Sequence, residues 1–247
     1  MTASKSDGFT VLRPQGRGRF LLLCDHASHF IPAELNALGL PAAALATHIA
    51  CDIGAAAVTE RLSEFLDAPA IFSAVSRLVV DCNRHIDAPD LIPEISDGTI
   101  IPGNRGLTDQ VRSRRIAQWF TPYHDAVEAL LATRIDAGLS PMVVSVHSMA
   151  ATMGGVVRPW QIALSTHHER RFAEPVLTIL RSLDGVTVGD NQPYDIDPAI
   201  DFSTPYHAMR RHLPHLQVEF RQDEVGDSAG QEKWARRFAD AVLAART

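Results

Sequence analysis

Short apolar runs alternate along this chain with longer stretches of helical periodicity. Phe20–Leu23 is a continuous apolar run, and such a run is typical of a strand that is buried on both faces of a sheet. Similar short runs predict further strands at Ala70–Ser73, Leu78–Asp81, Met142–Val146, Gln161–Leu164, Val186–Val188 and Leu216–Phe220.

Helices are expected between these strands. In Ile53–Leu66 the apolar residues Val58, Leu62 and Phe65 recur at the spacing of one helix face. The other expected helical segments are a short turn at Pro32–Leu40, a long helix between Thr108 and Gly138, and helices at Glu169–Leu183, Pro205–Leu213 and Ser228–Ala245.

Particular residues predict where the helices begin or bend. Asp52 can cap the helix that follows it, and Thr108 can cap the long helix. Ser228 with Gln231 fits a capping box at the start of the last helix. Pro122 lies inside the long helical pattern and predicts a kink or a break there.

Strands that alternate with helices predict an α/β fold. We expect a three-layer α/β/α sandwich with a mostly parallel, mixed central sheet. At 247 residues the chain is at the upper end of what one hydrophobic core supports, and no internal linker is visible. The sequence therefore predicts a single domain over residues 1–247, in which residues 1–19 form a loose leader or an edge segment.

Composition and charge exclude several classes of function. The net charge is −6 and the chain has no basic block, which argues against a nucleic-acid partner. No apolar run reaches the ~18 residues that a membrane span needs, and MTASKSDG lacks an apolar signal core, so we expect a cytoplasmic protein without a membrane partner. Three cysteines without CxxC spacing argue against a disulfide framework and a structural zinc site.

Polar residues follow several of the predicted strands. They are His26, the Arg77–Arg84 segment, His147 and Glu219. Open α/β sheets bind ligands at the carboxyl ends of their strands. No GxSxG elbow, Walker loop or GxGxxG fingerprint is present, so serine acyl transfer, nucleotide hydrolysis and dinucleotide chemistry lack their usual motifs. Histidines with carboxylates at one sheet edge favour a catalytic zinc site, which needs three protein ligands and one open position.

Each candidate also has a purely structural explanation. Either histidine could serve only to satisfy backbone groups, and Glu219 could be a solvated residue on a half-exposed strand. Arg77 and Arg84 could belong to a structural ion-pair cluster with Asp81. The combination on separate strand ends is what favours the catalytic interpretation.

Five segments in sequence order resemble the N-formylglutamate amidohydrolase family. The segments are CDHASHFIP, SRLVVDCNR, VVSVHSM, DNQPY and VEFRQDEV, and the resemblance extends from about Leu21 to the last helix. The same arrangement is more distantly similar to zinc carboxypeptidases and aspartoacylase. The resemblance therefore implies a zinc-exopeptidase-like sheet and one Zn²⁺ per chain.

The resemblance also implies the metal ligands. His26 and His147 match the two metal-binding histidines, and the resemblance favours Asp52, in the CDIGA segment, as the third ligand. His29, three residues after His26, is the alternative third ligand. Ser145 stands two residues before His147, where relatives often have an aspartate, so His147 needs a different partner to orient it.

The remaining roles follow from the same resemblance. Glu219 matches the general base, and Arg77 matches the arginine that polarises the scissile carbonyl. Asn83 and Arg84 match the pair that holds a substrate carboxylate. The further candidates for substrate binding are Ser148, Arg158 and Tyr194.

The implied activity is the zinc-dependent hydrolysis of a small N-acyl amino acid. N-formylglutamate, which would give formate and glutamate, is the leading substrate. Another N-acyl amino acid or a dipeptide is the alternative for an enzyme of the same chemistry. A metal-free binding protein is the non-enzymatic alternative, and the absence of an acidic residue at position 29 is its only support. The sequence leaves the oligomeric state open.

Overall fold

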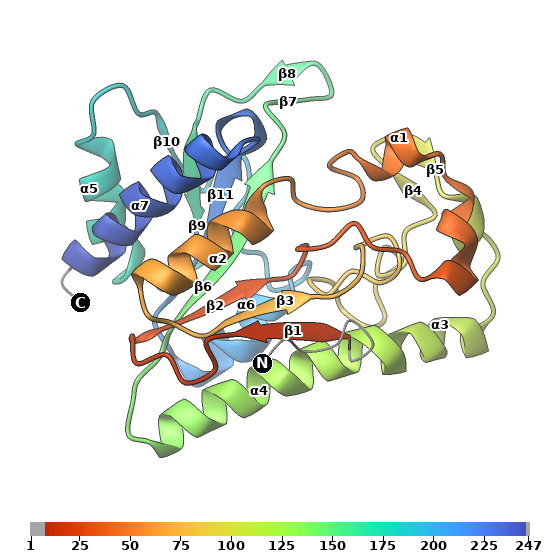
Figure 1. Cartoon of the computed structure of the whole chain (residues 1–247), viewed down its shortest axis with the longest axis horizontal. Coiled ribbons are helices and arrows are strands. Elements are labelled where there is room, and N and C mark those ends of the chain that lie inside the picture. Colours follow the sequence, from red (N-terminus) through yellow and green to blue (C-terminus); the bar gives the residue numbers. More distant parts are fainter. Residues whose placement is uncertain (1–7, 246–247) are drawn as a thin grey trace.

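The computed structural model describes residues 8–245, and its centre is a seven-stranded sheet with helices on both faces (Figure 1). The strand order is β1-β3-β2-β6-β11-β9-β10. The strands are β1 (Phe9–Leu12), β2 (Phe20–Cys24), β3 (Ala70–Ser73), β6 (Met142–Met149), β9 (Ile162–Ser165), β10 (Val188–Asp190) and β11 (His215–Arg221). Within this sheet the β1–β3 and β9–β11 pairs are antiparallel, and the other neighbouring strands are parallel. The predicted three-layer α/β/α sandwich with a mostly parallel sheet is confirmed; the likeness to zinc exopeptidases stays a prediction.

The helices form the two outer layers. They are α1 (Ala42–Leu45), α2 (Ala55–Phe65), α3 (Asp109–Arg115), α4 (Thr121–Asp136), α5 (Ala173–Arg181), α6 (Ser203–His207) and α7 (Ser228–Ala244). Helices α2, α5 and α7 cover one face of the sheet, and α4 and α6 cover the other (Figure 1). Among residues 8–245, no helix is both long and apolar enough to cross a membrane.

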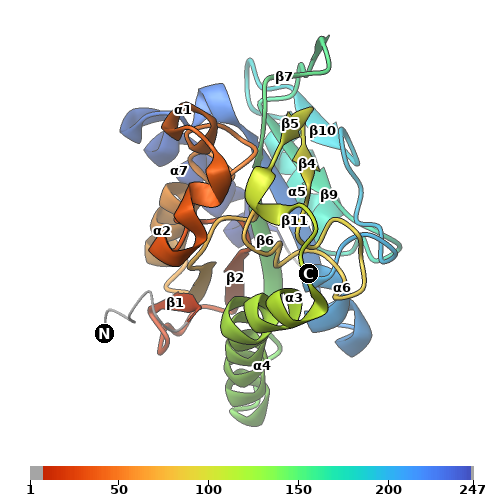
Figure 2. The ribbon, with the colours of Figure 1, turned by 90° about the vertical axis from the view of Figure 1, so that its right-hand side faces the viewer.

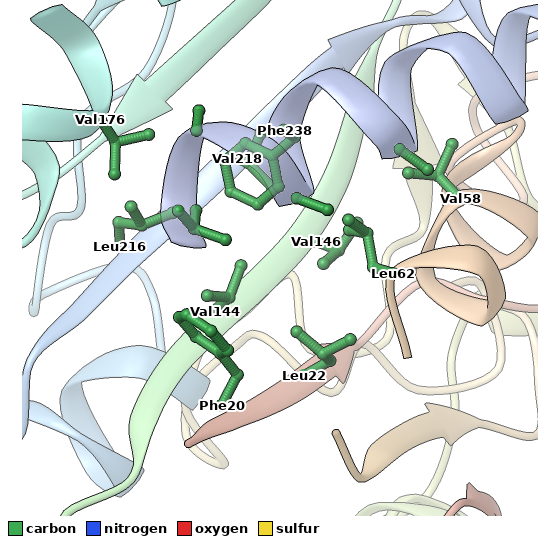
Figure 3. Close-up of a cluster of buried hydrophobic side chains, with 14 of the residues drawn as sticks. Phe20, Leu22, Val58, Leu62, Val144, Val146, Val176, Leu216, Val218 and Phe238 are labelled. Carbon is green, nitrogen blue, oxygen red and sulfur yellow. The ribbon is translucent and has the colours of Figure 1, made fainter. Parts of the chain in front are cut away.

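The central strands are apolar on both faces because both faces are covered. Along β2, Phe20 and Leu22 point toward α2 and α7, while Leu21 and Leu23 point toward α4. Figure 3 shows the first of these cores, where Phe238 of α7 and Leu62 of α2 meet side chains from the sheet. Successive side chains along a strand point to opposite faces of the sheet. Every second side chain of β6 and β11 therefore lies on the face that α4 covers, and the site uses these side chains.

Two small hairpins interrupt the long connections of the chain. One consists of β4 (Ile95–Ser96) and β5 (Thr99–Ile100), and the other of β7 (Thr152–Met153) and β8 (Val156–Val157). Figures 1 and 2 show both hairpins at the end of the molecule that lies away from α4. Each hairpin contributes residues to the main pocket described below.

The expected strand at Leu78–Asp81 is wrong. This segment forms buried turns, with Leu78, Val79 and Val80 packed in a second hydrophobic cluster. The turns bring Arg77 Nη2 within 2.8 Å of Asp81 Oδ2. An extended strand would separate two residues four apart by about 13 Å. A short buried apolar run has no period that tells a strand from a turn.

Other local predictions are corrected at helix ends. The last helix is capped by Asp227, whose Oδ1 accepts a hydrogen bond from the Gly230 backbone N–H at 2.8 Å, and not by Ser228 with Gln231. Gly54, and not Asp52, is the residue that precedes α2, and it has a φ of +80°. A side chain at Gly54 would also meet the Val225 carbonyl oxygen.

The long helix and the amino-terminal segment behave largely as expected. Thr108 caps α3 through Oγ1, and a π-helical turn, Ile116–Phe120, separates α3 from α4 just before Pro122. Within the predicted leader, Phe9–Leu12 forms an edge strand along β3. Residues 1–7 of the leader lie outside the described residues.

Candidate metal centre

The site lies at the carboxyl ends of three adjacent strands, β2, β6 and β11. In the register of β6 with β11, His147 lies opposite Glu219 and Ser145 lies opposite Gln217. All four residues are on the face of the sheet that α4 covers. His26 follows β2 by two residues, so the chain directs it into the same region. The sheet itself therefore brings together three of the residues that the sequence marked.

His26, Asp52 and His147 form a buried group that could hold a metal ion. One ligand atom from each lies within 4.8 Å of the other two. Asp52 Oδ2 lies between the two imidazoles, 3.3 Å from His26 Nδ1 and 2.9 Å from His147 Nδ1. Asp52 reaches this position from the turn before α2, where its backbone N–H donates to the His26 carbonyl oxygen.

The donor set fits a zinc ion. Ligands about 2.0–2.2 Å from a tetrahedral zinc lie roughly 3.3–3.6 Å from each other. His26 Nδ1 lies 3.3 Å from Asp52 Oδ2, at that spacing, whereas His147 Nδ1, at 2.9 Å from the same oxygen, would move apart from it to admit an ion. Two imidazoles and one carboxylate also leave the fourth position open, as in catalytic rather than structural zinc sites.

A carboxylate behind each histidine orients its ring. Asp81 Oδ1 accepts a hydrogen bond from His26 Nε2 at 2.7 Å, and Asp25 Oδ2 lies 3.4 Å from His147 Nε2. Ser145 Oγ also contacts that nitrogen, at 2.9 Å. Since each carboxylate fixes the hydrogen on Nε2, Nδ1 of both rings is directed toward Asp52 as a ligand atom.

The electrostatics of the group favour a cation between the two rings. Burial alone would lower the pKa of both histidines, but Asp81 and Asp52 raise the pKa of His26, and Asp25 and Asp52 raise that of His147. Burial would raise the pKa of Asp52, yet the histidines hold it below its ordinary value. A metal ion would replace the protons on the two Nδ1 atoms, because histidine binds metals in its neutral form.

Asp25 is the group that orients His147 in place of the aspartate that relatives often have at the position of Ser145. Its carboxylate accepts hydrogen bonds from Tyr123 Oη at 2.6 Å, Ser203 Oγ at 2.8 Å and Ser145 Oγ at 3.1 Å. Burial would raise the pKa of Asp25, but His147, His26 and the hydrogen bond from Tyr123 lower it, so the group is ionised. No apolar or helical period identifies Asp25; its position directly before His26 is the only signal in the sequence.

We expect Asp25→Asn to weaken zinc binding by about 10–100-fold, the usual effect of removing a group that orients a metal ligand. The reason is that an asparagine that keeps its bonds to Tyr123 and Ser203 turns an N–H toward His147 Nε2. Tyr123→Phe removes only one of the supporting bonds and should have a smaller effect. Competition with a zinc chelator measures both affinities, and an unchanged affinity in Asp25→Asn would contradict the role of Asp25.

Arg77 lies beside the metal group and is fixed by two carboxylates, Asp52 of that group and Asp81 behind His26. Its Nε donates to Asp81 Oδ2 at 3.0 Å and its Nη1 to Asp52 Oδ1 at 3.3 Å. Burial would lower the pKa of Arg77, but Asp81 and Asp52 raise it, so the guanidinium is always charged. Arg77 also lines the pocket, so its charge is available to a bound substrate.

Glu219 is a buried carboxyl that faces the metal group. Its Oε1 accepts a hydrogen bond from Gln217 Nε2 at 3.1 Å. Burial is the main cause that raises the pKa of Glu219 to about 7, with a contribution from Asp52, although His147 and His26 act in the opposite direction. A carboxyl whose pKa lies near neutral pH is suited to accept and return a proton.

The raised pKa of Glu219 predicts a pH-dependent cost in the metal-free protein. The pKa of Glu219 is higher in the folded chain than its ordinary 4.5. The contribution of protonated Glu219 to the free energy of unfolding is therefore fully present below pH 4.5 and is lost as the pH rises through 7. We expect Glu219→Gln to stabilise the metal-free protein at pH 8, by about 3 kcal/mol at most, and much less at pH 4.5. Denaturant unfolding after treatment with a chelator measures this difference, and an equal effect at both pH values would contradict it.

The metal group opens into a pocket of about 490 Å³. Its lining includes every predicted site residue except His29: His26, Asp52, Arg77, Asn83, Arg84, His147, Ser148, Arg158, Tyr194 and Glu219. His29 is exposed and is not part of the metal group. The geometry thus supports Asp52 rather than His29 as the third ligand.

Asn83 and Arg84 face the pocket from the turns after Asp81. Both ends of the Asn83 amide are used within the chain: Nδ2 donates to Asp201 Oδ1 at 2.9 Å, and Oδ1 accepts from the backbone N–H groups of Phe202 and Ser203. Arg84 donates to Asp90 and to the Asn83 carbonyl oxygen. Asn83 therefore fixes the start of α6, and Arg84 is the charged member of the pair.

Comparisons with known proteins show the family of the chain. A sequence model of the N-formylglutamate amidohydrolase family matches residues 18–225. The chain belongs to this family. No curated protein sequence matches it.

Two crystal structures of similar proteins support the fold of this amidohydrolase family member. The gene product Atu2144 from Agrobacterium tumefaciens is 31% identical, with a TM-score of 0.93 over 99% of this chain and 98% of that one. The N-formylglutamate amidohydrolase from Ralstonia eutropha JMP134 is 22% identical, with a TM-score of 0.73 over 96% of each chain. Family membership indicates a hydrolase that acts on an amide bond of a small molecule.

Proposed function

We propose that this amidohydrolase is a zinc-dependent enzyme that hydrolyses N-formylglutamate to formate and glutamate. The observation that carries the proposal is the buried group of His26, Asp52 and His147 with Glu219 beside it, at the end of one pocket. Zinc held by the three side chains would supply a Lewis acid that lowers the pKa of a water molecule to about 7.

Glu219 is the proton carrier of the proposed reaction. It takes a proton from the attacking water as the new C–O bond forms at the formyl carbon. It then gives that proton to the amide nitrogen as the C–N bond breaks, so that glutamate leaves as an amine and formate remains. The raised pKa of Glu219 favours both transfers near neutral pH, because neither form of the carboxyl is strongly preferred.

Arg77 stabilises the negative charge that develops on the formyl oxygen. Its guanidinium is already oriented by Asp52 and Asp81, so no side-chain reorganisation is needed during the reaction. Arg84, whose Nη1 donates to the Asn83 carbonyl oxygen, binds the carboxylate next to the scissile amide, and Ser148 also lines the pocket. Arg158 and Tyr194 complete the proposed substrate-binding set.

A formate-release assay with defined metal content tests this function. We expect N-formylglutamate to be hydrolysed by protein that contains one zinc per chain, little activity after the metal is stripped, and recovery on adding one equivalent of Zn²⁺. N-acetylglutamate and a glutamyl dipeptide should be poorer substrates by kcat/KM. Full activity in the stripped protein would contradict the metal-dependent mechanism.

A further inference from the structure

Arg158 is an almost fully buried cation without a carboxylate partner among residues 8–245. Only 8% of its surface is exposed. Its Nη2 donates to Tyr194 Oη at 2.6 Å and contacts Met153 Sδ at 3.0 Å, and both acceptors are neutral. The guanidinium also lies over the Tyr194 ring, with Cζ 4.9 Å from the ring centroid. Arginine is rarely buried in this way unless a negative charge is close to it.

The other arginines of the pocket are already neutralised within the chain. Arg77 pairs with Asp52 and Asp81, and Arg84 pairs with Asp90 and with Asp201. An added anion must share those two guanidinium groups with carboxylates. Arg158 alone among the pocket arginines offers a charge that no protein carboxylate occupies.

Two nitrogens of the Arg158 guanidinium group have no hydrogen bond within the described residues. These atoms, Nε and Nη1, are not among the buried unpartnered atoms, so they keep exposed surface, and Arg158 lines the pocket. The backbone is fixed at both ends: its N–H donates to the Ala151 carbonyl oxygen at 2.9 Å, and its own carbonyl accepts from Arg221 Nη1 at 3.2 Å. The guanidinium is therefore a positioned donor rather than a mobile surface charge.

Arg158 belongs to a part of the pocket that is separate from the metal group. None of its contacts is to His26, Asp52, His147 or their orienting carboxylates. It stands between β8 and β9 and is held by Tyr194 of the loop after β10. A carboxylate next to the scissile amide would lie near Arg77 and Arg84, whereas a carboxylate at the far end of a substrate side chain would extend away from them.

We propose that Arg158, held by Tyr194, binds the side-chain carboxylate of an acidic N-acyl amino acid and so selects N-formylglutamate over N-formylglutamine, whose side chain ends in a neutral amide. This assignment rests on the proposed function for the identity of the substrate. A charged guanidinium in a nearly buried position binds a carboxylate through charge-assisted hydrogen bonds. The side-chain amide of N-formylglutamine can accept the same hydrogen bonds, but it has no negative charge to pair with the guanidinium.

The test compares N-formylglutamate with N-formylglutamine, which differ only at the terminal group. We expect the wild type to prefer N-formylglutamate by roughly 10²-fold or more in kcat/KM. Arg158→Met should reduce this preference to less than about tenfold, because the loss in kcat/KM falls mainly on N-formylglutamate. Tyr194→Phe and Arg158→Lys should each lose part of the preference, and they keep the test valid if Arg158→Met fails to fold. Arg171→Met, which alters an arginine side chain that is 76% exposed, is the matched control.

Calorimetric binding of glutamate and glutamine to the zinc-loaded protein separates the two proposals. Binding of glutamate that depends on Arg158, without turnover of any formyl substrate, would support the carboxylate site and overturn the proposed hydrolysis. Turnover with equal kcat/KM for the two substrates, or an unchanged preference in Arg158→Met, would overturn the role of Arg158 alone. Neither binding nor turnover of an acidic ligand would overturn both.

Discussion

Replacement of Glu219 by glutamine is expected to lower kcat on N-formylglutamate by at least about 10²–10⁴-fold, the contribution of a well-placed general base. Glutamine has nearly the same shape and can keep the contact with Gln217, so the pocket should persist. It cannot accept the proton of the attacking water or return it to the leaving nitrogen. Steady-state kinetics with N-formylglutamate measure the effect.

The zinc content of Glu219→Gln shows whether the lower kcat comes from the missing base or from loss of the metal. Glu219 is not part of the metal group, so Glu219→Gln should retain one zinc per chain. Glu174→Gln, which alters an exposed carboxylate on α5 that pairs with Arg170, is the matched control and should be fully active. Wild-type activity in Glu219→Gln would show that another group transfers the proton.

Replacement of Asp52 by asparagine is expected to abolish zinc binding and activity together. Asp52 contacts both histidine Nδ1 atoms and Arg77, so one substitution removes a ligand charge and the carboxylate that both rings and the guanidinium share. We expect a loss of zinc affinity larger than the roughly 10–100-fold effect of losing a group that only orients a ligand. Metal analysis after dialysis against a weak chelator measures it.

The exposed histidine beside the site supplies the matched control. His29→Gln removes the alternative third ligand, and it should keep its zinc and its activity, because His29 lies outside the metal group. The opposite pattern, with zinc lost in His29→Gln and kept in Asp52→Asn, would overturn the ligand set.

The sequence predicted the central strands well because their burial leaves a strong signal. Phe20–Leu23 faces helices on both sides, so every position is apolar. The buried turns at Leu78–Val80 show the same composition for a different reason, since they pack against a separate cluster of loops and helices. Composition reports burial, but backbone conformation there depends on contacts that are distant in sequence, such as the hydrogen bond from the Asp81 N–H to the Leu91 carbonyl oxygen.

Site residues that follow a strand could be predicted from the sequence. Residues that orient or hold another site residue through distant contacts were harder to predict. His26, His147 and Glu219 could be found because each stands at or just after the end of an apolar run. Asp25 is also at a strand end, yet its role depends on Tyr123 and Ser203, which are 98 and 178 residues away. The clamp that Asn83 forms on the segment before α6 spans a similar distance and has no local pattern.

Zinc-edge anomalous diffraction from crystals of the zinc-loaded protein tests the central claim most directly. We predict one peak per chain, about 2.0–2.2 Å from His26 Nδ1, His147 Nδ1 and an Asp52 carboxylate oxygen, with the fourth position open toward Glu219. A peak bound by His29 in place of Asp52, or no peak between the two histidines, would contradict it.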